Sequence, residues 1–150
     1  MRPYTGWDGD ARGVQPGLKA LVDVIVFLNQ GKIRNLGTWQ KRYAKGKPGQ
    51  PSVHGTGRAA DLGWTTKADA DQLIRWLVDN ADGLGLELLI DYNPKPFGRA
   101  WRCDRARWKS YDRRTVAGAP GGKWIHIEIS PAMSKNVDAM NQAITKALGG

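Results

Sequence analysis

Cysteine is nearly absent from this chain, since Cys103 is the single one among 150 residues. One cysteine excludes an intramolecular disulfide and a zinc finger built on cysteines. Long apolar runs are missing too. The longest, residues 21–28, is interrupted by Asp23 and is far shorter than the roughly 20 residues of a membrane span. We therefore expect no transmembrane helix and a fold that needs no disulfide.

Acidic residues are missing from residues 31–60, in a chain whose net charge is +9. The basic residues of this first cluster are Lys32, Arg34, Lys41, Arg42, Lys45, Lys47 and Arg58. A second basic cluster comprises Arg99, Arg102, Arg105, Arg107, Lys109, Arg113 and Arg114. Nucleic acid, anionic cell-wall polymer and a membrane surface are possible partners for such charge, and solvated loops without a ligand are the alternative.

Length and composition indicate one domain over residues 1–150, because 41% hydrophobic residues suffice for a core. Periodicity and capping residues predict helices over 16–30, from Thr65 or Thr66 to 83, and over 131–148, with strands over 58–64, 86–90 and 123–130. Residues 93–121 are expected to be irregular, and residues 1–15 to form an extended N-terminal segment that frays. This order predicts an α+β fold with a mainly antiparallel sheet and helices on one side.

The chain has only two histidines, and the first lies close to a carboxylate. His54 and Asp61 are joined by small residues that allow the backbone to turn tightly between them. An imidazole and a carboxylate are ligands that Zn²⁺ accepts, and a catalytic zinc site needs three protein ligands and an open position. His126 is the candidate third ligand.

The strand that carries His126 alternates in character. Its isoleucines, Ile125, Ile127 and Ile129, share one face because side chains at i and i+2 point the same way. Trp124, His126 and Glu128 share the opposite face. This face is interpreted as part of a site, and the alternative is that its residues are solvent-exposed positions of a half-buried strand.

Residues 52–61 resemble the S-x-H-x-x-G-x-A-x-D signature of zinc D-alanyl-D-alanine carboxypeptidases and phage L-alanyl-D-glutamate endopeptidases. The matching positions are Ser52, His54, Gly57, Ala59 and Asp61. Downstream, Trp124-Ile125-His126 is similar to the element that supplies the family's last zinc ligand. The resemblance spans roughly residues 35–130, and it implies a metallopeptidase-like α+β domain with zinc held by His54, Asp61 and His126.

The chain departs from that family at the general base. The family places a carboxylate or a histidine shortly before the last zinc ligand, where this sequence has Lys123 and Trp124. Glu128 is the nearest replacement because it shares a strand face with His126, and its alternative role is to orient the site from outside the ligand set. Further candidates for the base are Asp91, Asp104 and Asp112.

Substrate contacts are expected from residues around the two motifs. Arg42 and Arg34 lie upstream of His54, where the family often has a substrate-binding arginine, and either would suit stabilisation of a developing oxyanion. Arg42 is taken as the catalytic candidate and Arg34 as a substrate-binding one. Ser52 and Trp124 complete the expected substrate-binding set.

The resemblance implies a zinc peptidase that cuts peptidoglycan stem peptides and adsorbs to anionic wall polymer. The N-terminal residues lack the apolar stretch of a secretory signal. We therefore expect the protein either to stay in the host cytoplasm until a holin releases it, or to be carried on a virion with virion proteins as partners. In both cases the expected place of action is the bacterial cell wall. The alternatives are a virion component of the same fold with little or no activity, and a nucleic-acid-binding module supported by charge and seven tryptophans.

Overall fold

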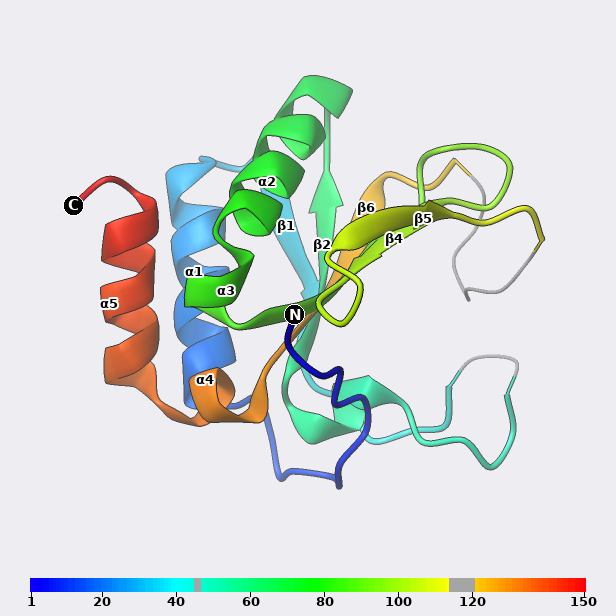
Figure 1. The fold of residues 1–150 in the computed structure, drawn as a ribbon, viewed down its shortest axis with the longest axis horizontal. Coiled ribbons are helices and arrows are strands. Elements are labelled where there is room, and N and C mark those ends of the chain that lie inside the picture. Colours follow the sequence, from blue (N-terminus) through cyan, green and yellow to red (C-terminus); the bar gives the residue numbers. More distant parts are fainter. Residues whose placement is uncertain (45–46, 114–120) are drawn as a thin grey trace.

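A six-stranded antiparallel sheet organises the molecule (Figure 1), with the strands in the order β1-β2-β6-β3-β4-β5. The computed structural model describes residues 1–44, 47–113 and 121–150. The strands are β1 Ile33–Gly37, β2 Ala59–Trp64, β3 Leu86–Asp91, β4 Arg99–Arg102, β5 Arg107–Ser110 and β6 Trp124–Ile129. The predicted antiparallel sheet is thus confirmed.

Helices cover one side of this sheet (Figure 1). They are α1 Pro16–Leu28, α2 Lys67–Asp79, α3 Ala81–Leu84, α4 Pro131–Lys135 and α5 Val137–Ala147, and a 3₁₀ turn, η1, spans Val53–Thr56. The α+β fold class is confirmed. In the described part of the chain, every helix is too short or too polar to cross a bilayer.

The core lies between the helices and one face of the sheet. Ile125, Ile127 and Ile129 of β6 are at most 1% exposed and belong to a cluster that includes Leu18 of α1 and Leu77 of α2. Each fully buried side chain of this size contributes about 1.5–3 kcal/mol to folding. The opposite face of the same strand is therefore left for other contacts, as the alternation predicted.

Several elements differ from the sequence-based expectation. Residues 93–121 are not wholly irregular, because they contain the β4 and β5 hairpin, and β1 was not predicted. Both edge strands bury too few residues to show alternation, since only Ile33 of β1 is buried. The last helix is interrupted at Asn136, whose side chain accepts a hydrogen bond from Ala139 N–H at 2.9 Å and so starts α5.

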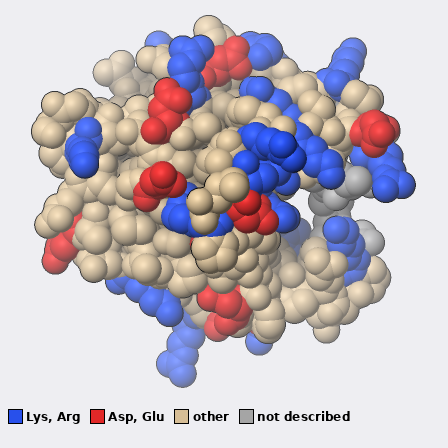
Figure 2. Space-filling model, viewed as in Figure 1, with Lys and Arg blue, Asp and Glu red and all other residues tan. Residues whose placement is uncertain are grey.

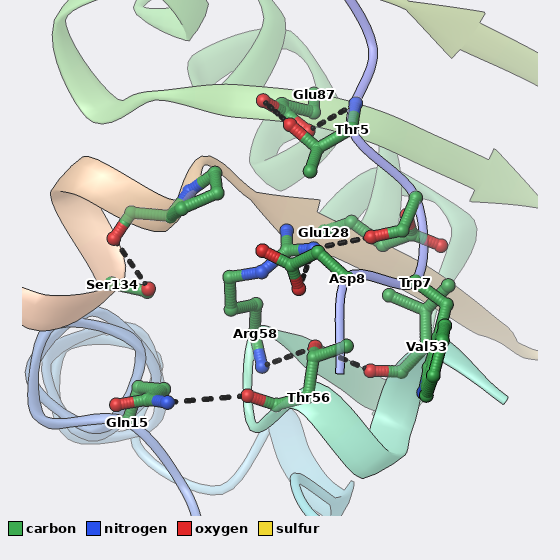
Figure 3. Close-up of polar contacts among 12 residues, drawn as sticks. Thr5, Trp7, Asp8, Gln15, Val53, Thr56, Arg58, Glu87, Glu128 and Ser134 are labelled. Carbon is green, nitrogen blue, oxygen red and sulfur yellow. Dashed lines mark hydrogen bonds and ion pairs between the residues drawn. The ribbon is translucent and has the colours of Figure 1, made fainter. Parts of the chain in front are cut away.

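The N-terminal segment, residues 1–15, was expected to fray, and the structure corrects this. It has no helix or strand, but side chains and backbone tie it to the sheet. Arg2 donates to the carbonyl of Leu86, and Thr5 donates to Glu87 through its backbone N–H and its hydroxyl, each at 3.0 Å. Figure 3 shows Thr5 beside Glu87. The segment is thus part of the folded domain.

Candidate metal centre

The η1 turn positions the first histidine. Ser52 Oγ accepts a hydrogen bond from the backbone N–H of His54 at 3.3 Å, which caps the turn. Gly57 ends the turn with φ +72°, a left-handed conformation that glycine adopts without steric cost. A Cβ on Gly57 would lie 2.3 Å from the carbonyl oxygen of Gly13. The turn is therefore held between its own cap and the N-terminal segment.

The pairing of β2 with β6 positions the other two candidates. Asp61 lies directly opposite His126 in the antiparallel register, so their side chains share one face of the sheet. This face is the one opposite the core isoleucines. His126 and Glu128 are 8% and 3% exposed, so the alternative that they are solvent-exposed positions of a half-buried strand is wrong, and His54 is equally buried at 7%.

The three side chains converge on one point. His54 Nε2 lies 3.2 Å from Asp61 Oδ2, and His126 Nδ1 lies 3.0 Å from Asp61 Oδ1. One potential ligand atom from each residue lies within 4.8 Å of the other two. Ligand atoms bound to Zn²⁺ at 2.0–2.1 Å in a tetrahedron are about 3.3 Å apart. The donor set and its spacing therefore fit a divalent metal ion of this kind.

The protonation of this cluster follows from its contacts. Burial raises the pKa of Asp61, but hydrogen bonds from His126 and His54 outweigh burial and hold that pKa below the usual range of a carboxyl. Burial lowers the pKa of His126, but its hydrogen bonds to Asp61 and Glu128 prevail and raise the pKa to about 10. Asp61 is thus an anion, and a metal ion held by His126 would have to displace a proton.

Glu128 contacts the second nitrogen of His126. Its Oε2 lies 2.7 Å from His126 Nε2, and its Oε1 accepts a hydrogen bond from the hydroxyl of Tyr4 at 2.7 Å. Glu128 is only 3% exposed. Both of its oxygens therefore have hydrogen-bond partners, in the arrangement by which carboxylates orient metal-binding histidines.

The residues expected to bind substrate differ in how they lie relative to this cluster. Arg34 lies opposite Gly63 in the register of β1 and β2, and a Cβ on Gly63 would be 3.1 Å from its guanidinium, so Arg34 covers the site face of the sheet. Trp124 stacks on Tyr92 with ring centroids 3.9 Å apart. Arg42 is exposed, and the carbonyl of Arg42 accepts a hydrogen bond from the backbone N–H of Ser52. The hydroxyl of Ser52 already caps η1 by accepting the hydrogen bond from His54 N–H.

Burial raises the pKa of Tyr92, and the charges of Asp61 and Glu128 raise it further, while Arg42 opposes them. Tyr92 stacks on Trp124, which shares the strand face of His126, and so lies on the same side of the sheet as the candidate metal centre. The sequence could not predict that Tyr92 lies near His126. Tyr92 follows β3, and β3 and β6 become neighbours only when they pair in the sheet.

The aspartates proposed as alternative bases lie elsewhere. Asp91 is opposite Ile125 in the register, which puts its side chain on the core face, and it pairs with Arg99 at 3.1 Å. Asp104 pairs with Arg102 at 2.7 Å, and Asp112 is exposed. The metal cluster found in the described residues contains none of the three.

Not every residue of the two basic clusters lies at the surface. Arg58, a member of the first cluster, is 1% exposed and donates to the carbonyl of Ile129 and to Asp8. Figure 3 shows Asp8 beside Arg58. Lys45 and Arg114 fall outside the described residues. Figure 2 shows basic side chains gathered where β4 and β5 lie, with acidic ones interspersed.

Fold and site together define a small α+β protein with a candidate His-Asp-His metal centre. The chain belongs to the family described as VldE, C-terminal domain, whose model matches residues 10–119. The matched region includes His54 and Asp61 and ends before His126. Comparison with curated proteins and with solved structures gave no match.

Proposed function

We propose that this protein is a zinc-dependent peptidase that hydrolyses peptidoglycan stem peptides. The observation that carries the proposal is the convergence of His54, Asp61 and His126 within 4.8 Å of one another. These are the three residues that the resemblance to the zinc D-alanyl-D-alanine carboxypeptidases implies as ligands. Two of them come from one short motif, and the third comes from a strand 65 residues further along.

We assign a separate role to each residue of the site. His54, Asp61 and His126 Nδ1 would hold the ion, and zinc in such a site acidifies a water molecule and polarises the scissile carbonyl. Glu128 fixes the ring of His126 through Nε2. Arg34 is exposed on the site face of the sheet, and Arg42 is exposed in the segment whose backbone pairs with Ser52, so their guanidinium groups are available to a stem-peptide carboxylate or a developing oxyanion.

Anionic wall polymer is the proposed second partner, attracted by the net charge of +9. The proposed place of action is the bacterial cell wall, reached by holin release from the host cytoplasm or on a virion.

A catalytically weak virion component with this fold is the second candidate. Two observations favour it: Lys123 stands where the related peptidases have a carboxylate, and both oxygens of Glu128 already have donors. Binding of zinc is common to both candidates, and turnover separates them.

The test measures zinc and hydrolysis on the same preparation. Wild-type protein should contain one zinc per chain by elemental analysis and release stem-peptide fragments from purified peptidoglycan. A chelator should stop this release, and added zinc should restore it. Asp61→Asn should lose stoichiometric zinc and hydrolysis together, because an amide is a weaker ligand than a carboxylate.

Asp91→Asn is the matched control, since it removes a buried carboxylate from the opposite face of the sheet. It should keep zinc. Asp61→Asn with unchanged zinc affinity would refute the ligand set, and zinc-loaded wild-type protein that releases no fragments would favour the virion component.

A further inference from the structure

The N-terminal segment contacts the candidate metal centre from two sides. Near its end, Ala11 N–H donates to the carbonyl of Gly55 at 2.7 Å, and Gln15 N–H donates to that of Gly57 at 3.0 Å. These bonds support the turn that carries His54. Near its start, the hydroxyl of Tyr4 donates to Glu128. Residues 124 positions apart in the sequence therefore meet beside the metal cluster.

Tyr4 belongs to a chain of hydrogen bonds that ends at a candidate ligand. Its hydroxyl donates a hydrogen bond to Glu128 Oε1 at 2.7 Å, and Glu128 Oε2 is hydrogen-bonded to His126 Nε2, also at 2.7 Å. The other nitrogen of His126, Nδ1, faces Asp61. If Nδ1 holds a metal ion, the remaining proton of the imidazole would reside on Nε2, from which it would be donated to Glu128. Tyr4 is thus one hydrogen bond further from the candidate metal centre than Glu128.

The tyrosine ring is itself held in place. The guanidinium carbon of Arg102 lies 4.7 Å from the centre of the Tyr4 ring, and that guanidinium is bonded to Asp104. The neighbouring Thr5 is bonded to Glu87. The hydroxyl of Tyr4 is therefore presented to Glu128 in a fixed geometry.

Loss of this hydroxyl would leave a buried carboxylate oxygen without its donor. Glu128 is 3% exposed, so water is a poor substitute. The carboxylate would then be free to rotate toward another donor. Such a rotation weakens its hydrogen bond to His126 Nε2, and with it the orientation of Nδ1.

We propose that Tyr4 is a positioning residue of the metal centre, which acts through Glu128 on the orientation of His126. This inference rests on the proposed metal site. It extends that site to a residue, Tyr4, that lies outside both sequence motifs and before the region matched by the family model.

The experiment compares two matched hydroxyl deletions in the full chain. Tyr4→Phe removes the hydroxyl that binds Glu128, and Thr5→Val removes the hydroxyl that binds Glu87, which is another buried glutamate. Zinc affinity is measured by competition with a chromophoric chelator, and unfolding in urea is followed for each protein. Tyr4→Phe should bind zinc about 10-fold more weakly, the lower end of the range for groups that contact a metal ligand directly, because Tyr4 acts through Glu128; Thr5→Val should stay within about twofold of the wild type.

A cobalt spectrum and a double variant give independent readings. The visible absorption of the Co²⁺ form should change in Tyr4→Phe and not in Thr5→Val, because the spectrum reports ligand geometry. In a Glu128→Ala background, Tyr4→Phe should cause no further loss of zinc affinity, since the residue through which it acts is gone.

Three results would overturn the inference: equal zinc affinity in Tyr4→Phe and wild type, equal losses in Tyr4→Phe and Thr5→Val, or a full additional loss in the Glu128→Ala background. Wild-type protein that binds no zinc is a different result. It refutes the metal centre itself and is seen before any variant is compared.

Discussion

Glu128 illustrates how a single residue's role depends on its hydrogen-bond partners. The strand period places it beside His126, which is compatible with a general base and with an orienting carboxylate. The structure gives each of its oxygens a partner at 2.7 Å, Tyr4 on one and His126 on the other. This geometry favours the orienting role, and a base would have to release one of these bonds first.

Glu128→Gln separates the two roles. An orienting carboxylate predicts that zinc affinity falls about 10–100-fold, because the amide is a weaker acceptor for the imidazole N–H. A general base predicts unchanged zinc affinity and a loss of about 10²–10⁴-fold in the rate of stem-peptide release. We expect the first result, measured by zinc competition and by fragment release at saturating zinc. Glu87→Gln is the control, and an unchanged zinc affinity in Glu128→Gln would contradict the orienting role.

At the scale of elements, η1 depends on a close approach between two distant segments. Gly57 has φ +72°, and a Cβ there would lie 2.3 Å from Gly13 O and 3.0 Å from Gln15 N. A side chain would therefore clash with backbone that cannot easily move. Because His54 lies in the same turn, the clash should be transmitted to the metal cluster.

Gly57→Ala should accordingly lower both stability and zinc affinity. The left-handed backbone alone costs a non-glycine residue about 1–2 kcal/mol, and the clash adds to this. Urea unfolding and zinc competition measure the two effects. Gly83→Ala is the control, because Gly83 is exposed in α3 and a Cβ there meets nothing within 4 Å. If Gly57→Ala matches the wild type in both measurements, the described contact with Gly13 is wrong.

For the molecule as a whole, the net charge of +9 predicts adsorption to anionic wall polymer. Binding to purified cell walls should fall as salt rises, because the screening length decreases from about 10 Å at 0.1 M to about 3 Å at 1 M ionic strength. A sedimentation assay over that range measures the effect. Arg58 should not contribute, since it is buried and bonded to backbone carbonyls.

Replacement of both Arg34 and Arg42 by alanine should weaken this adsorption more than Lys135→Ala with Lys146→Ala, which removes the same charge from α4 and α5. Adsorption that is unchanged between low and high salt would show that the basic residues are only a solvated surface.

Much of the fold and part of the site could be predicted because their signals are local. Alternation along residues 124–129 assigned the isoleucines to the core and His126 to the other face, and the helices at Pro16 and at Thr66 begin where capping and periodicity predicted. The spacing of His54 and Asp61 is likewise contained in one short segment. β1 and β5 escaped prediction because edge strands bury too little to leave a pattern, and β4 because its two buried residues, Ala100 and Trp101, are adjacent and so show no alternation.

The sequence by itself determined which residues share a strand face or a turn, since these depend on backbone periods of a few residues. Only the tertiary structure decided which of them meet. The pairing of β2 with β6 brings Asp61 to His126, and the return of the N-terminal segment brings Tyr4 to Glu128 and buries Arg58. These contacts arise when the helices and the N-terminal segment close over the two faces of one sheet, and no local pattern encodes a partner 50 to 124 residues away.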